Sequence, residues 1–209
     1  MFFFYSLSVF FYTGLIKIAS LFNRKARQWT QGRKQWHGSL KKAITKDNPW
    51  VWFHASSLGE FEQGRPVMEA FRQKYPQYKI VLTFFSPSGY EVRKNYDGAD
   101  HVCYLPADTP GNVRKFIETV NPAMVFFIKY EFWFNYIRII NKKNIPLFFF
   151  SVKFRPGQHF FMWYGGWFRT MLKKINWIFV QDESSKKLLY HVGITNASVS
   201  GDTRFDRVL

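Results

Sequence analysis

Apolar residues dominate the first 22 positions of the chain, where Lys17 is the only charged side chain. A helix that crosses the hydrocarbon core of a membrane needs about 20 residues at about 1.5 Å each, so this segment is just long enough. We expect residues 1–22 to form a membrane-associated helix that spans the bilayer or lies in its interface. An ordinary buried helix is the alternative.

Short apolar runs then alternate with segments that carry helix signals, from residue 49 to residue 209, after a polar and basic linker or helix at 23–48. This alternation predicts an α/β fold with a mostly parallel sheet and helices on both faces. The expected strands are 50–54, 79–85, 101–105, 123–128, 146–151 and 177–181, and the expected helices are 60–74, 88–95, 109–120, 130–141, 160–175 and 182–192.

The charge balance indicates an anionic partner. The chain of 209 residues has 30 Lys and Arg against 14 Asp and Glu, a formal net charge of +16. Nucleic acid, an anionic membrane surface and phosphorylated substrates all fit this charge, and a merely solvated basic face is the alternative. Because basic residues follow the apolar segment and none precedes it, the positive-inside rule places the rest of the chain in the cytoplasm.

The composition excludes several classes of protein. A hydrophobic content of 47% with 21% charged residues excludes wholesale disorder. The single cysteine, Cys103, excludes a disulfide framework within the chain and a cysteine-based zinc finger. The five histidines show no ligand spacing, so we expect no metal site and no cofactor.

Ligands of parallel α/β sheets bind beyond the carboxyl ends of the strands, so the residues that follow each strand are the candidates for chemistry. Ser56, Ser57 and Gly59 follow the first expected strand and can present hydroxyl and N–H groups to an anion. Glu60 falls at the start of the next helix, whose dipole should lower the pKa of its carboxyl. The alternative is that Glu60 only caps this helix.

Two further strand ends carry polar residues. Ser86, Ser88 and Gly89 form a second turn into a helix, for which a plain helix cap is the alternative. Glu131 stands beside aromatic residues after the fourth strand, where partial burial would perturb its pKa. A salt bridge from Glu131 to Lys129 or Arg138 is the alternative.

Taken together, these segments resemble the N-terminal half of 3-deoxy-D-manno-octulosonic acid (Kdo) transferases, which glycosylate lipid A in Gram-negative bacteria. The resemblance covers essentially the whole chain, and its most specific parts are residues 54–60 and 104–110. The other matching segments are residues 1–22, 23–27, 32–34, 86–89, 130–133 with Asn135, and 201–206. Lys129 and Tyr130 depart from the Glu-Thr of many members, as Phe134 departs from Pro and Arg204 from Lys.

The resemblance implies a GT-B enzyme made of two Rossmann-like domains, in which the first binds the lipid acceptor and the second binds CMP-Kdo. Residues 49–209 would be the acceptor-binding domain, and the donor-binding domain is expected to be absent from this chain. Glu60 matches the general base of the family, and Glu131 and Arg204 match positions that stabilise the transition state. We expect the acceptor to contact Ser56, Ser57, Gly59, Arg65, Ser86, Ser88 and Gly89.

The resemblance therefore implies an inverting transfer of Kdo from CMP-Kdo to a lipid A precursor (lipid IVA) at the cytoplasmic side of the inner membrane. The expected partners are this lipid, CMP-Kdo and the membrane, without nucleic acid. The rival hypothesis is a non-enzymatic basic module that binds anionic lipid or nucleic acid. It explains the charge of +16 but not the serines and carboxylates at the strand ends.

Overall fold

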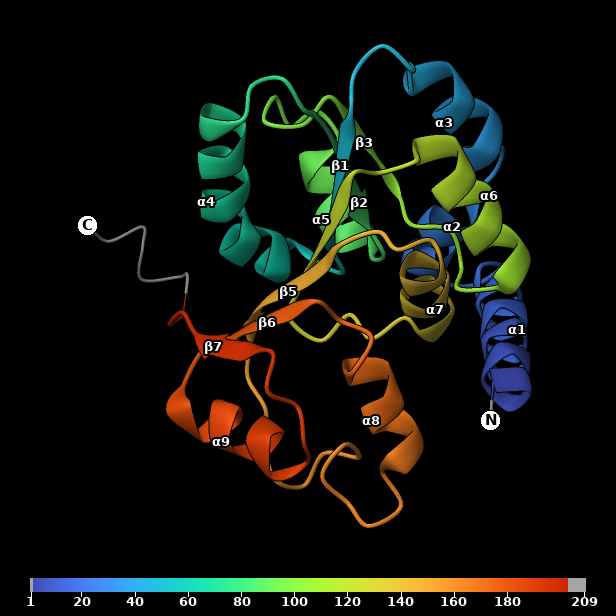
Figure 1. The fold of residues 1–209 in the computed structure, drawn as a ribbon. Coiled ribbons are helices and arrows are strands. Elements are labelled where there is room, and N and C mark those ends of the chain that lie inside the picture. Colours follow the sequence, from blue (N-terminus) through green and yellow to red (C-terminus); the bar gives the residue numbers. More distant parts are fainter. Residues whose placement is uncertain (1, 203–209) are drawn as a thin grey trace.

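A single parallel sheet is the centre of the computed structural model, which describes residues 2–202 (Figure 1). Its seven strands lie in the order β3-β2-β1-β4-β5-β6-β7, and every neighbouring pair is parallel. The first six strands of this order match the doubly wound arrangement of Rossmann folds. The strands are β1 (Trp50–Ala55), β2 (Lys79–Phe84), β3 (His101–Tyr104), β4 (Met124–Ile128), β5 (Leu147–Val152), β6 (Trp177–Val180) and β7 (Ala197–Val199).

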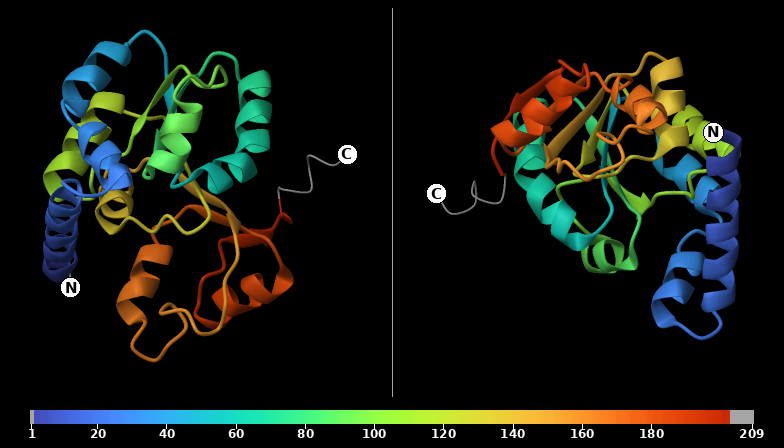
Figure 2. Two further views of the ribbon diagram at one scale, coloured as in Figure 1. Left: turned by 180° about the vertical axis from the view of Figure 1, so that it is seen from behind. Right: turned by 90° about the horizontal axis from the view of Figure 1, so that it is seen from below.

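Helices cover both faces of this sheet, because its strands are apolar on both sides. In β1, Trp50 and Trp52 enter one apolar cluster, whereas Val51 and Phe53 enter the other. Figure 2 shows the two layers from further sides. The first cluster is covered by α3 (Trp36–Ala43), α6 (Pro110–Val120), α7 (Phe134–Lys142), α8 (Gly166–Leu172) and α9 (Glu183–His191), and the second by α4 (Leu58–Lys74) and α5 (Pro87–Arg93).

The predicted fold class is therefore confirmed, and the six expected strands are present with ends that differ by one residue at most. Three details were not predicted correctly. The three-residue strand β7 was missed, the helix expected at 160–175 spans only Gly166–Leu172, and the helix expected from residue 130 begins at Phe134.

Asp108 fixes the start of α7. It lies in the loop after β3, is 1% exposed, and accepts hydrogen bonds from the backbone N–H groups of Asn135 (3.1 Å) and Tyr136 (3.0 Å). These N–H groups belong to the first turn of α7, so a residue distant in sequence caps this helix. The same carboxylate accepts a hydrogen bond of 2.6 Å from the hydroxyl of Tyr5.

The basic segment at 23–48 forms α2 (Arg24–Gln31) and α3, and Arg33 between them does not belong to a solvated face. Its guanidinium lies 3.9 Å from the ring centre of Trp29. It donates hydrogen bonds of 2.8 Å to the carbonyl groups of Phe85 and Leu105. Arg33 therefore ties the basic segment to the carboxyl ends of β2 and β3, because Phe85 and Leu105 directly follow these strands.

The N-terminal helix α1 (Phe2–Ala19) is long and apolar enough to cross a membrane, by length and composition. One stripe of α1 packs on the domain. Val9 is buried, and the ring of Tyr5 lies 4.8 Å from that of Phe134. The opposite side of α1 exposes large apolar side chains, which include Phe3, Phe4, Phe10, Phe11, Leu15 and Ile18.

Candidate active site at the carboxyl edge of the sheet

The crevice expected of a doubly wound sheet lies between β1 and β4. These strands are neighbours, but the chain leaves β1 towards β2 through α4 on one face and leaves β4 towards β5 through α7 on the other. Ligands of such sheets bind where the strand order reverses. The segments that carry Glu60 and Glu131 both leave the sheet at this point.

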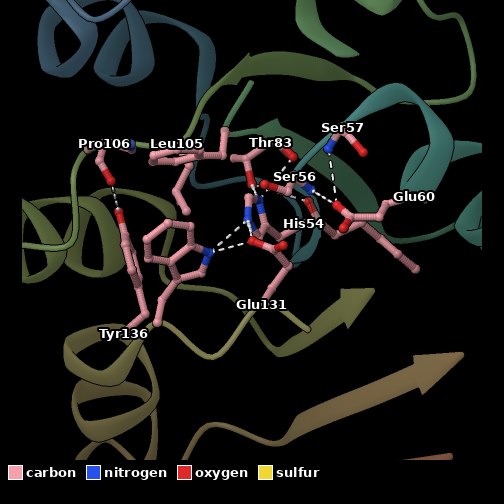
Figure 3. A network of polar contacts seen from close by, with 12 residues as sticks. His54, Ser56, Ser57, Glu60, Thr83, Leu105, Pro106, Glu131 and Tyr136 are labelled. Atoms are coloured by element: carbon pink, nitrogen blue, oxygen red, sulfur yellow. Dashed lines mark hydrogen bonds and ion pairs between the residues drawn. The ribbon is translucent and has the colours of Figure 1, made fainter. Parts of the chain in front are cut away.

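Glu60 lies in the first turn of α4, where its carboxylate closes a capping box with Ser57. Its Oε2 atom accepts hydrogen bonds from the backbone N–H groups of Ser56 (2.6 Å) and Ser57 (3.1 Å) (Figure 3). The Oε1 atom has no hydrogen-bond partner among residues 2–202, so the carboxylate retains a free acceptor. Glu60 does cap its helix, and this leaves one oxygen for a ligand.

The pKa of Glu60 is raised, which contradicts the expectation that the helix dipole lowers it. Burial of the side chain is the main cause, and the negative charge of Glu131 adds to it. His54 and the N–H groups of Ser56 and Ser57 lower the pKa of Glu60 but do not outweigh these effects. A carboxylate with a raised pKa is a stronger base than an ordinary surface glutamate.

Glu131 is 6% exposed and is held by two donors rather than by Lys129 or Arg138. Its Oε2 atom accepts a hydrogen bond of 2.6 Å from the indole N–H of Trp133 and lies 3.1 Å from Nε2 of His54. The salt-bridge alternative is therefore wrong, because the partners of Glu131 are His54 and Trp133. Figure 3 shows Glu60 and Glu131 beside the same stretch of chain, His54 to Ser56.

His54 is completely buried and links Glu131 to the interior of the sheet. Its Nδ1 atom lies 2.8 Å from the hydroxyl of Thr83, which accepts a hydrogen bond of 2.8 Å from the indole N–H of Trp52. The Nδ1 atom also lies 3.1 Å from the carbonyl oxygen of Thr83, and the Thr83 hydroxyl donates to the carbonyl of Phe53 at 3.4 Å. The network therefore fixes the Glu131 carboxylate from behind.

Sequence reasoning missed this function of His54, Thr83 and Trp133. His54 is the polar residue of β1, whose other residues are all apolar and buried, and a buried polar group needs partners. A histidine within this apolar strand was the sequence signal for a buried polar network. The identity of the partners was not readable from the sequence, because Thr83 and Glu131 lie on other strands or their loops.

The turn before Glu131 contains an unusual backbone conformation. Lys129 has φ of 64°, in the left-handed region that side chains other than glycine rarely adopt. Such residues cluster at binding and catalytic sites, where the surrounding structure holds them in place. At this position the turn directs the chain from the end of β4 to Glu131 and Trp133.

The other predicted site residues divide into two groups. Ser86 donates its backbone N–H to the carbonyl of Ser56 (2.7 Å), which joins the loops after β1 and β2. The hydroxyl of Ser86 also caps α5, and Ser88 is exposed beside it. The structure therefore brings Ser56, Ser57, Ser86 and Ser88 to one edge of the sheet, and Gly59 is exposed in the first turn of α4.

Gly89 and Arg65 make contacts within the domain. Gly89 is buried, and a Cβ atom there would lie 2.3 Å from the ring of Phe84, so the close approach of α5 to β2 requires this glycine. Arg65 forms an ion pair of 2.6 Å with Glu69 on the same helix. Arg204 lies outside the described residues.

No group of three His, Cys, Asp or Glu side chains that could hold a metal ion occurs within residues 2–202. The polar groups of the site are instead carboxylates, hydroxyls and backbone N–H groups. This set suits proton transfer and hydrogen bonding to a hydroxylated ligand.

Comparison with known proteins gives one family. The family model described as 3-deoxy-D-manno-octulosonic-acid transferase (kdotransferase) matches residues 27–207. A 3-deoxy-D-manno-octulosonic acid transferase of Haemophilus influenzae is 26% identical over 94% of this chain and 49% of its own length. The protein of that name from Aquifex aeolicus is 33% identical over 44% of this chain and 26% of its own length. The chain thus spans half or less of these relatives.

Solved structures with similar folds include UDP-GlcNAc 2-epimerases. The enzyme from Neisseria meningitidis matches with a TM-score of 0.53 and 18% identity over 75% of this chain and 48% of its own. A putative one from Listeria monocytogenes matches with a TM-score of 0.57 and 13% identity over 76% of this chain and 46% of its own. At these identities the likeness concerns the fold.

Proposed function

The chain belongs to the Kdo transferase family, and on that premise we propose that it forms the acceptor-binding half of an enzyme that transfers Kdo to a lipid A precursor. The observation that carries this proposal is the pair of carboxylates, Glu60 and Glu131, at the switch point of the sheet. The donor is CMP-Kdo, bound by a second domain as in other GT-B enzymes, and no cofactor takes part.

In this proposal Glu60 acts as the general base. The oxygen of an acceptor hydroxyl forms a bond to the anomeric carbon of Kdo, while the bond from that carbon to the phosphate oxygen of CMP breaks. The hydroxyl proton passes to Oε1 of Glu60, and CMP leaves with the electron pair of the broken bond. Attack from the face opposite to CMP inverts the anomeric centre, and one base is sufficient.

Glu131 would support this reaction without accepting the proton. Trp133 and His54 hold its carboxylate in one orientation, and its charge raises the pKa of Glu60. Two nearby carboxylates with different surroundings commonly take different roles in one reaction. In this proposal the hydroxyls of Ser56, Ser57, Ser86 and Ser88 bind the sugar or phosphate groups of the acceptor.

The proposed base gives a prediction for the pH dependence of transfer. Because the pKa of Glu60 is raised and the base must be deprotonated, kcat/KM should fall on the acid side at a pH above the ordinary glutamate range. Glu131→Gln removes one cause of the raised pKa, so this acid limb should move to lower pH. Transfer rates measured across pH for both proteins test this. An unmoved limb in Glu131→Gln would contradict the proposed coupling.

A direct test of function is the transfer of labelled Kdo from CMP-Kdo to a lipid A precursor by a protein that includes the donor-binding half. The rival basic module predicts no transfer and instead tight binding to nucleic acid. That binding would weaken steeply with salt, because released counterions drive it. Nanomolar DNA binding with a steep salt slope and no Kdo transfer would overturn the proposal.

We also propose that α1 holds the protein on the cytoplasmic face of the inner membrane. Its exposed apolar side and the following basic residues, such as Arg24, Lys25 and Arg27, suit an anionic bilayer surface. The packing of Tyr5 and Val9 on the domain supports a helix that lies in the interface. If α1 spanned the bilayer, its first half, which contains Tyr5 and Val9, would lie far from a cytoplasmic domain and could not pack on it.

Two measurements test this attachment. A high-salt wash should leave the protein in the membrane fraction, whereas Phe11→Asp with Ile18→Asp, on the exposed side of α1, should release it. An epitope fused before residue 1 should be digested by protease in inverted vesicles and protected in spheroplasts. Digestion in spheroplasts would show a spanning helix and contradict the interfacial arrangement.

A further inference from the structure

An apolar groove of about 350 Å³ lies between α1 and the carboxyl edge of the sheet. One wall comes from α1, with Val9 and Tyr12, and Trp29 of α2 stands beside it. The opposite wall is formed by Phe85, Ala107 and Trp133, which belong to the loops after β2, β3 and β4. The groove is therefore built from five separate parts of the chain.

The chemistry of the groove is that of a site for hydrocarbon. Most of its lining is aliphatic or aromatic, and its buried polar groups are largely bound to one another. The carboxylate of Asp108 accepts from Tyr5, and the indole N–H of Trp133 donates to Glu131. Such polar groups present no free charge to an occupant, so an apolar chain could enter without leaving them unpaired.

Trp29 is the exception. It is 7% exposed, and its indole N–H has no acceptor among residues 2–202. Buried donors are nearly always paired in native proteins, so this one indicates a missing acceptor. An acyl chain brings such an acceptor, because the carbonyl oxygen of its ester or amide lies at the end of the hydrocarbon.

The position of the groove connects the membrane side of the molecule with the candidate active site. Trp133 lines the groove and also binds the Glu131 carboxylate at 2.6 Å. On the other side, α1 separates the groove from the exposed apolar stripe of Phe3, Phe10 and Leu15. An acyl chain in the groove would therefore lie close to the membrane hydrocarbon that this stripe contacts.

We propose that this groove binds one acyl chain of a lipid and so positions the head group of that lipid at Glu60 and Glu131. That the lipid is the sugar acceptor rests on the proposed function. The binding of an acyl chain does not depend on it. In this arrangement α1 serves as one wall of the binding site in addition to its contact with the membrane.

The test uses the 209-residue chain in digitonin, a detergent without alkyl chains, and a lysophospholipid whose single acyl chain carries a photoreactive diazirine. Crosslinking should saturate with probe and map by mass spectrometry to groove residues such as Tyr12 and Phe85. Thr13→Trp, which fills the groove from α1, should weaken the apparent affinity at least about tenfold. The matched control Leu15→Trp, on the exposed stripe, should leave it unchanged.

Ala107→Phe fills the groove from the opposite wall and gives a second test, with circular dichroism to verify that each variant is folded. Labelling confined to the exposed stripe of α1, or labelling that never saturates, would overturn the proposal. Equal affinities of Thr13→Trp and Leu15→Trp for the probe would also overturn it. So would evidence that a second copy of the protein, and not the probe, occupies the groove. Saturable labelling without any Kdo transfer would overturn the proposed function alone and leave the acyl-chain site standing.

Discussion

Glu60→Gln should lower turnover about 10²-fold or more in a protein that includes the donor-binding half, because the amide cannot accept the proton of the acceptor hydroxyl. The amide oxygen can still accept from the N–H groups of Ser56 and Ser57, so the start of α4 should survive. Single-turnover transfer of labelled Kdo measures the chemical step, and thermal unfolding verifies the fold.

The matched control for this variant is Glu69→Gln, on the same helix. Glu69 is exposed and pairs with Arg65, so turnover of Glu69→Gln should stay close to that of the wild type. If Glu60→Gln also keeps near-normal turnover, the base lies elsewhere and Glu131 becomes the next candidate. A raised KM with an unchanged kcat would assign Glu60 to acceptor binding and not to proton transfer.

Asp108→Ala should destabilise the protein by about 3 kcal/mol, because it leaves the buried donors of Tyr5, Asn135 and Tyr136 without their acceptor. Urea unfolding at neutral pH measures this loss. Tyr5→Phe is the control that removes only the bond to α1, and it should cost about 1 kcal/mol. Equal losses for the two variants would show that capping of α7 contributes nothing.

The contribution of Asp108 should also depend on pH. Burial raises the pKa of its carboxyl to about 6, whereas the unfolded chain has the ordinary value of 3.8. Protonation therefore favours the folded state. The advantage of wild type over Asp108→Asn should be fully present below about pH 4 and should be lost as the pH rises through about 6. Unfolding free energies of both proteins across this range test the sign, and an advantage that grows with pH would contradict it.

The sheet could be predicted from the sequence because each long strand is a mostly apolar run, which both faces of a covered parallel sheet require. The strand β7 could not, because three residues at the edge of the sheet carry too little pattern. The start of α7 was also beyond local reasoning. It depends on Asp108, a residue that lies 27 positions before the Asn135 that it caps.

The candidate site was predictable to a similar degree. Glu60 and Glu131 follow apolar strands, and the rule for parallel sheets brings such residues to one edge. The burial of Arg33 and the partners of His54 were not readable, because both depend on contacts between loops that are distant in sequence. The direction of the Glu60 pKa was wrong for the same reason. Burial and the charge of Glu131 outweigh the helix terminus that the sequence reveals.

The pairing of β1 with β4 has a consequence for the order of folding. It joins Val51 to Met124, so α4, β2, α5, β3 and α6 all lie in the loop that it closes. Closing a long loop costs chain entropy before its contacts form, and pairings of this kind are slow. A folding intermediate that contains only β1 to β3 would already hold Glu60 in its capping box but would leave His54 without Glu131. We therefore expect the two carboxylates to meet only in a late step, so that partly folded chains carry no assembled site.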